Sequence, residues 1–308
     1  MSAQAWHSQS FVGALLGAAF SLVGCDDSLK SVSLIEETRV LGARVEVESE
    51  PTRSSPNPGE RATVRLFVAA PSEPANLSYA LSVCAVSPVN TGFPNCGRAP
   101  FASTLQAEPG TAAPSLDFQV PTDLDLAATP HGFASALVCP GSSLEPDENG
   151  RPSCTNGPGL NVNFEFDLGG PDSANHSPSI TADALTFDGQ PWLASEATTC
   201  PGDLLGVSAN SKHALAITLS DTDFEPLPQT TSLEPGREAL LVSQFSTAGK
   251  LSHAFVSLKA DTQVADRTLS WDAPAANGEA ATLVRFYYVV RDARGGEDFA
   301  TRALCISP

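Results

Sequence analysis

Apolar and polar residues alternate along much of this chain, and this alternation restricts what it can fold into. The clearest run places Leu160, Val162, Phe164, Phe166 and Leu168 at every second position. A period of two turns one face of an extended strand toward a core, whereas a helix needs a period of 3.6. Turn-forming stretches such as SEPTRSSPNPGE separate the alternating runs, and no long segment has helical spacing. The pattern predicts an all-β protein built as antiparallel sandwiches.

The strand pattern is interrupted once by a polar stretch rich in chain breakers, residues 169–178. We expect a linker there, between a first sandwich at 39–168 and a second at 179–308. Each part has about 130 residues, which is enough to bury a core of its own. The chain is therefore predicted to hold two β-sandwich domains in tandem.

An apolar run near the amino terminus, Phe11 to Gly24, resembles a targeting segment. It has fourteen residues, whereas a membrane-spanning helix needs about 20, and it fits the apolar core of a secretion signal. It ends in Leu22-Val23-Gly24-Cys25, which resembles the lipobox of bacterial lipoproteins. That resemblance implies that residues 1–24 are a cleaved signal peptide and that Cys25 carries the lipid. Residues 25–38 would then form a tether.

The lipobox resemblance also implies a location. Two or three acyl chains, palmitate among them, hold a protein on a bilayer effectively permanently, whereas one chain binds reversibly. We expect a cell-envelope protein that is lipid-anchored to the outer membrane. Asp26, directly after the cysteine, favours the alternative of the periplasmic face of the inner membrane. The segment Met1 to Ser10 departs from ordinary signals because it has His7 but no Lys or Arg.

The cysteine count supports an oxidising compartment. With Cys25 assigned to lipid, six cysteines remain, an even number that predicts three disulfides. Nearness in sequence and the domain division favour the pairs Cys84 with Cys96, Cys139 with Cys154, and Cys200 with Cys305. An alternative pairs Cys84 with Cys139 and Cys96 with Cys154.

Two segments carry a second resemblance. TLSWDAPAANG followed by RFYYVVRDARGGEDFATRALC, near the carboxyl terminus, is similar to the last strands of bacterial immunoglobulin-like repeats of the polycystic-kidney-disease or cadherin-like type. The opening, TRVLGARVEVESEP with PGERATVRLFVAAP, resembles the first two strands of those repeats. The resemblance, shared with secreted lipoproteins of high-GC Gram-negative bacteria, implies immunoglobulin-like sandwiches and no particular activity.

Charge and motifs narrow the classes of function. The net charge of −18 disfavours nucleic-acid binding, which depends on clustered Lys and Arg. The sequence has no GxSxG elbow, no HExxH and no phosphate-cradling GxxxxGK[ST]. We therefore expect no catalytic residues, no cofactor and no enzyme activity.

Carboxylates and aromatic rings supply the remaining candidates. Asp221, Asp223 and Asp292 are candidate calcium ligands, because calcium takes several oxygen ligands; ordinary turn chemistry is the other interpretation. Trp192, after a Gly-Gln-Pro turn, is the candidate exposed ring for a glycan. Of the adjacent Tyr287 and Tyr288, one is expected outside its sandwich.

These observations favour a structural or interaction protein of the cell envelope. The membrane is its expected partner through the lipid, with envelope proteins or polysaccharide as further partners. The alternative is a carbohydrate- or calcium-dependent adhesive module at the cell surface.

Overall fold

The computed structural model of this chain describes most of the sequence after residue 30. The described residues are 31–71, 75–87, 94–97, 99–169, 174–195, 197–202, 204–227, 236–259, 269–276, 278 and 280–307. The lipobox, Cys25 and the expected signal peptide lie outside them. The described chain is all β apart from one 3-10 turn, η1 (Asp221–Asp223). None of its helices has the length and apolar character needed to cross a membrane.

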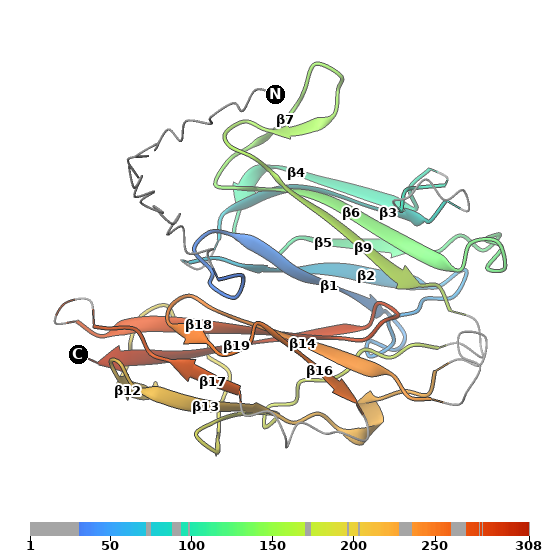
Figure 1. Ribbon diagram of the computed structural model, residues 1–308. Helices are drawn as coiled ribbons and strands as arrows, with labels where there is room; N and C mark the ends of the chain where they lie inside the picture. The colour runs from blue at the N-terminus through green and yellow to red at the C-terminus, as the bar shows by residue number, and fades with distance from the viewer. Residues whose placement is uncertain are drawn as a thin grey trace, which may run out of the picture. The chain divides into compact units, whose positions relative to one another are not determined.

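The first sandwich consists of two antiparallel sheets (Figure 1). One sheet has the order β1-β2-β5 and the other the order β4-β3-β6-β9. A small hairpin, β7 (Leu144–Pro146) with β8 (Pro152–Cys154), extends from it. The main strands are β1 (Arg39–Val47), β2 (Arg61–Ala69), β3 (Leu77–Ala85), β4 (Ala102–Gly110), β5 (Ser115–Gln119), β6 (His131–Pro140) and β9 (Leu160–Asp167).

The second sandwich also has two sheets, with the orders β11-β10-β13-β17-β15 and β12-β19-β18-β14-β16. Strand β12 runs parallel to β19, and all the other pairs are antiparallel. The strands are β10 (Leu185–Phe187), β11 (Gln190–Pro191), β12 (Gly206–Ser208), β13 (Lys212–Ile217), β14 (Ala239–Ser246), β15 (Lys250–Leu251), β16 (Phe255–Lys259), β17 (Leu269–Asp272), β18 (Thr282–Arg291) and β19 (Glu297–Ser307).

Both sandwiches share the immunoglobulin-like strand arrangement. The main strands in chain order are β1, β2, β3, β4, β5, β6 and β9 in the first sandwich, and β10, β13, β14, β16, β17, β18 and β19 in the second. In each sandwich, the first, second and fifth of these strands form one sheet (β1-β2-β5 and β10-β13-β17). The opposite sheet places the third main strand beside the sixth and the sixth beside the last (β3-β6-β9 and β14-β18-β19). This is the Greek-key division of immunoglobulin-like folds, with the fourth strand, β4 or β16, paired to the third. The expected fold class is confirmed.

Each sandwich buries its own core between its sheets. In the first, the inward side chains of alternating positions, including Val45, Val64, Leu81 and Val138, are at most 2% exposed. In the second, Trp271 fills the centre with Leu240, Phe286 and Leu304 around it. The inward positions on both facing sheets interdigitate, as a two-layer sandwich requires.

The closing hairpin is built by the motif that carries the immunoglobulin-like resemblance. Strands β18 and β19 pair over their whole length across the turn at residues 292–296. The Asp292 carboxylate accepts the backbone N–H groups of Arg294, at 2.7 Å, and Gly296, at 2.9 Å. Gly295 has φ of +93°, and a Cβ there would lie 2.6 Å from the Phe166 backbone. The Asp-x-x-Gly-Gly sequence is therefore a turn device.

The structure holds three disulfides, in the pairing favoured by sequence proximity. Cys84–Cys96, Cys139–Cys154 and Cys200–Cys305 have Cα–Cα distances of 5.6, 5.6 and 5.7 Å, within the usual range for a bridge. The first two close short loops in the first sandwich. The third spans 105 residues and joins the segment before β12 to β19.

Part of the expected linker is packed against the first sandwich. Residues 170–173 lie outside the described residues, but Asn175 is fully buried. Its backbone N–H donates to Ser55 Oγ at 2.8 Å, and its side-chain amide donates to Ser54 Oγ at 2.9 Å. The domain boundary itself stays a prediction.

Candidate binding groove between the sandwiches

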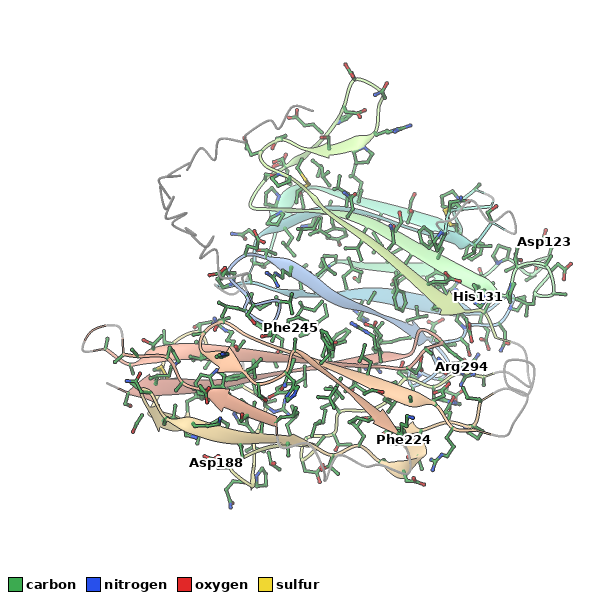
Figure 2. All side chains as sticks on the ribbon, viewed as in Figure 1. Asp123, His131, Asp188, Phe224, Phe245 and Arg294 are labelled. Carbon is green, nitrogen blue, oxygen red and sulfur yellow. A yellow bond between two sulfur atoms is a disulfide. The ribbon has the colours of Figure 1, made fainter. Side chains whose placement is uncertain are left out.

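The two sandwiches contact each other through the outer faces of two sheets. Leu41 of β1 and Ala69 of β2 pack against Tyr287 and Val289 of β18 in a buried apolar cluster. The partly buried rings of Phe67, Phe245 and Phe299 pack against the same cluster, and Figure 2 shows Phe245 between the two sandwiches. Phe67 and Phe299 stack with their centroids 4.5 Å apart. Apolar side chains thus cover both sheet faces where they meet.

This contact corrects two expectations about aromatic exposure. Tyr287 does point out of its own sandwich, but it is only 2% exposed because the first sandwich covers it, and its hydroxyl donates to Ala70 O at 3.1 Å. Tyr288 faces the core. Trp192, expected as an exposed ring, is 4% exposed; it packs edge-on against Phe286, and its indole N–H donates to Ala303 O. Trp192 is therefore a core residue and offers no glycan platform.

The contact surface opens at one end into a groove of about 810 Å³. One wall comes from β2, the start of β3 and the turn before β5, and the other from residues 180–198, β18 and β19. The lining is largely apolar, with Phe67, Tyr287 and Phe299 and several small alanines. This volume lies in the range of known small-molecule sites, which often form at domain interfaces.

The polar lining of the groove carries one sign of charge. Arg65, Arg285 and Arg302 line it, and the described lining residues include no Asp, Glu or His. Arg65 is half-exposed and is paired with Glu46 through an Nε–Oε2 contact of 3.0 Å. Neither Arg285 nor Arg302 has a carboxylate partner within the described ranges. The groove is thus cationic in a protein whose net charge is −18.

Arg285 and Arg302 use backbone carbonyls instead of carboxylates. Arg285 is 8% exposed, and its Nη2 donates to Ala197 O at 3.3 Å. Arg302, 2% exposed, donates from Nε to Trp192 O at 2.5 Å and from Nη1 to Thr301 O at 2.9 Å. A guanidinium has five N–H donors. Arg285 donates one of them to Ala197 O, so further N–H groups are available for a ligand.

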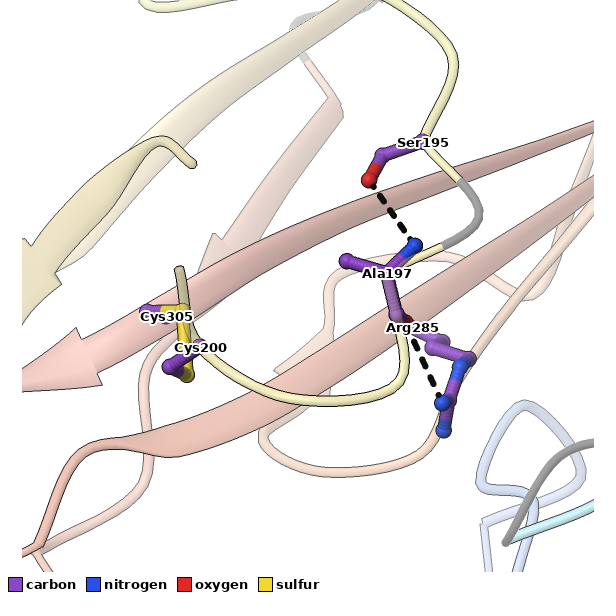
Figure 3. The surroundings of a disulfide bond; sticks show 5 residues. All are labelled: Ser195, Ala197, Cys200, Arg285 and Cys305. Atoms are coloured by element: carbon purple, nitrogen blue, oxygen red, sulfur yellow. Dashed lines mark hydrogen bonds between the residues drawn. A yellow bond between two sulfur atoms is a disulfide. The ribbon is translucent and has the colours of Figure 1, made fainter. Parts of the chain in front are cut away.

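The Cys200–Cys305 disulfide holds the groove wall that contains Ala197, whose carbonyl accepts a hydrogen bond from Arg285. Figure 3 shows the chain from Ala197 to Cys200 running beside β18 and β19, with the Cys200–Cys305 bridge at its end. Ser195 Oγ accepts the backbone N–H of Ala197 at 3.2 Å, which shapes this turn. The bridge therefore ties one wall of the groove to β19.

At another position between the sandwiches, buried and partly exposed charged groups pair with each other. Arg294, in the β18–β19 turn and labelled in Figure 2, donates to the carboxylates of Glu238 and Glu225, the latter at 2.5 Å. His176 contacts Glu225 at 2.6 Å and Glu50 of the first sandwich at 3.2 Å. The Asn175 side-chain amide donates to Asp292 at 3.0 Å. We call this set the polar junction.

Carboxylates outnumber cations around Arg294. Burial and, to a smaller extent, the nearby Asp292 raise the pKa of Glu238 to about 7, although Arg294 opposes both effects. Burial likewise raises the pKa of Asp292. The junction therefore holds a carboxyl group, that of Glu238, which takes up a proton near neutral pH.

The candidate calcium ligands are engaged with protein groups. Asp221 pairs with Arg237 at 2.8 Å. Asp223 accepts the backbone N–H groups of Ser220, at 2.7 Å, and Ser179, at 3.1 Å. Asp292 serves the hairpin turn and Asn175 as described above. In the part of the chain with described coordinates, no group of three His, Cys, Asp or Glu residues is placed to hold a metal ion.

One arrangement that sequence motifs missed has the contacts of a hydrolytic triad. Ser211 Oγ lies 2.6 Å from His213 Nε2, and His213 Nδ1 lies 2.7 Å from Asp188 Oδ2. However, Ser211 Oγ also lies 2.5 Å from Ser208 O, which can only accept, so the hydroxyl proton points to that carbonyl. A general base must instead receive this proton. None of the three residues lines the groove, and Figure 2 shows Asp188 on the outer side of the second sandwich.

The residues that form the groove were not identified from the sequence. Arg65 and Arg285 are separated by 220 positions, and each falls in an ordinary strand, β2 or β18. No local spacing connects them. The only available signal was the scarcity of basic residues, 17 against 35 acidic ones, which makes a gathering of three arginines in one groove distinctive.

Comparisons with known proteins identify no family. No protein-family model matches the chain, and no curated protein matches it. Among solved structures, it is similar to fibronectin(III)-like modules of Clostridium thermocellum CbhA, at 10% identity over 85% of this chain and 93% of that one, with a TM-score of 0.21. The two tandem V-type regions of VCBP3, a v-region-containing chitin binding protein, match at 10% identity over 88% and 100%, with a TM-score of 0.28.

A further match is red sea bream transglutaminase, at 9% identity over 88% of this chain, with a TM-score of 0.25. The chain spans about a third of that protein, 32% of its length. TM-scores this low carry no weight for fold or function. The immunoglobulin-like assignment rests on the strand order described above.

Proposed function

We propose that this protein is a lipid-anchored, non-catalytic binding protein of the cell envelope, and that the groove between its sandwiches is the binding site. The observation that carries the proposal is the groove itself. It is a largely apolar cavity with a few charged groups at a domain interface, the kind of position where ligand sites form. The paired immunoglobulin-like sandwiches suit a structural or binding module, since many cell-surface domains use this architecture.

The anchor is the lipobox at Leu22 to Cys25, with acylation at Cys25 and attachment to the outer membrane; the inner membrane is the alternative. Labelling cells with a palmitate analogue tests it. The wild-type protein should take up the label and a Cys25→Ser variant should not. Equal labelling of both would refute the anchor.

Photocrosslinking in living cells tests the groove as the binding site. A photoreactive phenylalanine analogue replaces Ala113, which lines the groove, or Lys212, which is exposed on the second sandwich. Adducts from position 113 with none from position 212 would support the proposal. Equal adducts from both positions, or none from 113, would contradict it.

The absence of catalysis is tested at the strongest competing site. A fluorophosphonate probe, which reacts with activated serines, should leave Ser211 unmodified because its proton points to Ser208 O. Labelling that disappears in a Ser211→Ala variant would show an enzyme instead.

A further inference from the structure

The groove combines an apolar lining with two arginines, Arg285 and Arg302, that have no acidic partner among the residues that the structure describes. Its apolar part is the stacked pair Phe67 and Phe299 with Tyr287 beside it. Its cationic part is Arg285, with Arg302 lying deeper. A ligand that fits both parts needs a long apolar body and an anionic group.

An unpaired buried cation is costly, because removal from water is not offset by an opposite charge. A carboxyl group in that position could take up a proton and become neutral, as burial favours for Glu238 at the polar junction. Arginine cannot lose its proton in this way. An anion in the groove is therefore what would balance Arg285, and the planar guanidinium fork matches a carboxylate with two parallel hydrogen bonds.

The lining favours an acyl chain over a peptide as the apolar body. Every peptide unit brings an N–H and a C=O that need partners when buried. The described lining offers alanines such as Ala75, Ala113 and Ala300 along the cavity, with a few hydroxyl groups between them. Methylene groups fit such a surface without leaving polar atoms unpaired.

We propose that the groove binds a single-chain amphiphile with a carboxylate head, such as a fatty acid, with its head at Arg285 and its chain along Phe67 and Phe299. This inference rests on the proposed function and names the ligand class of the same site. The Cys200–Cys305 disulfide keeps the site formed, because it holds the wall from Ser195 to Cys200 whose Ala197 carbonyl orients Arg285.

Binding of four probes to the full mature ectodomain, measured by calorimetry below micelle-forming concentrations, tests the inference. Dodecanoate should bind. Dodecanol, which has the chain without the charge, and dodecyltrimethylammonium, which has the opposite charge, should bind at least tenfold more weakly. Acetate, the head without the chain, should give no detectable binding.

Variants separate the head site from the chain site. Arg285→Gln should weaken dodecanoate at least tenfold and leave dodecanol unchanged. Ala300→Leu, which fills the groove, should weaken both. Arg151→Gln, at an exposed position of the first sandwich, is the matched control and should change neither. Thermal melts of each variant establish that it is folded.

Three results would overturn the inference. Equal binding of dodecanol and dodecanoate would show that no anionic head is recognised. Tighter binding of a peptide that ends in a free carboxylate would replace the acyl chain with a peptide. If no amphiphile binds while photocrosslinks still form from position 113, this inference fails and the proposed function stands.

Discussion

The two charged regions between the sandwiches have opposite imbalances. At the polar junction, Arg294 is surrounded by the carboxylates of Glu225, Glu238 and Asp292. In the groove, Arg285 and Arg302 lie without a carboxylate partner among the described residues. An excess of carboxylates can be relieved by protonation near neutral pH, whereas an excess of guanidinium cannot. The polar junction can therefore balance its own charge by taking up protons, whereas the positive charge of the groove can be balanced only by an anion from outside the protein.

Removing the Cys200–Cys305 bridge should have the largest effect, and it acts on the groove side. In the chain-entropy model a loop of about 100 residues contributes about 4.7 kcal/mol to the free energy of unfolding, and a loop of about 15 residues about 3 kcal/mol. A Cys200→Ala/Cys305→Ala variant should therefore lose more stability in urea denaturation than Cys139→Ala/Cys154→Ala. It should also lose dodecanoate binding, which the second variant should keep. Equal losses of stability and of binding would show that the bridge has no special role at the groove.

Two arginine variants compare the two regions directly. Arg294→Ala leaves Glu238, which is 2% exposed, without its cation, and breaking a buried pair in this way costs about 3–5 kcal/mol. Arg285→Ala strands no carboxylate among the described residues, so its loss in the free energy of unfolding should be much smaller. Chemical denaturation of both measures the difference. Comparable losses would mean that Arg285 has a structural partner equivalent to those of Arg294.

Glu297 lies outside the polar junction and accepts the Ala43 N–H across the contact between the sandwiches. It should give the free energy of unfolding a pH dependence. Burial raises the pKa of Glu297 to about 7, against opposing effects from Arg291 and the Ala43 N–H. The folded state then binds more protons than the unfolded state, so the free energy of unfolding should fall as pH rises from about 4.5 to about 7. Glu297→Gln should flatten this dependence by about 1–3 kcal/mol.

Unfolding curves at pH 5 and pH 8 measure this dependence, with Arg285→Gln as the variant that should keep the wild-type slope. An unchanged slope in Glu297→Gln would place the proton uptake elsewhere.

The smallest effect is expected from Tyr287, where the contact between the sandwiches is mostly apolar. Tyr287→Phe removes the hydrogen bond to Ala70 O and keeps the ring, so it should cost about 1 kcal/mol in the free energy of unfolding. Tyr287→Ala should cost several times more, because it also empties the apolar cluster. Similar losses of unfolding free energy in the two variants would show that Tyr287 stabilises the contact mainly through its hydrogen bond.

Much of the strand pattern was predictable because it is local. The run from Leu160 to Leu168 alternates visibly, and Thr282 to Arg291 is a nearly unbroken run of strand-forming residues; both form strands. Strand β4 was missed because its sequence, ASTLQAEPG, ends in Pro and Gly and alternates weakly. It lies at a sheet edge, where a residue without a backbone N–H is tolerated.

The candidate site could not be predicted, because its residues come together only when two sheets meet. Trp192 follows a turn and looked exposed, yet it fills a core; Tyr287 points outward and is covered by the other sandwich. Alternation shows which side of a strand a residue takes, but not what covers that side.

By itself, the sequence determined that the chain is all β and that two of its cysteine pairs lie close together along the chain. These properties depend on neighbours within a strand, a hairpin or a turn. Only the tertiary structure decided that a sheet face of each sandwich is buried against the other and that acids gather around Arg294. It also decided that Arg285 lines a groove in which no described residue is its acidic partner. The physical reason is that burial and charge balance depend on all atoms within a few ångströms, and those atoms come from strands more than two hundred residues apart.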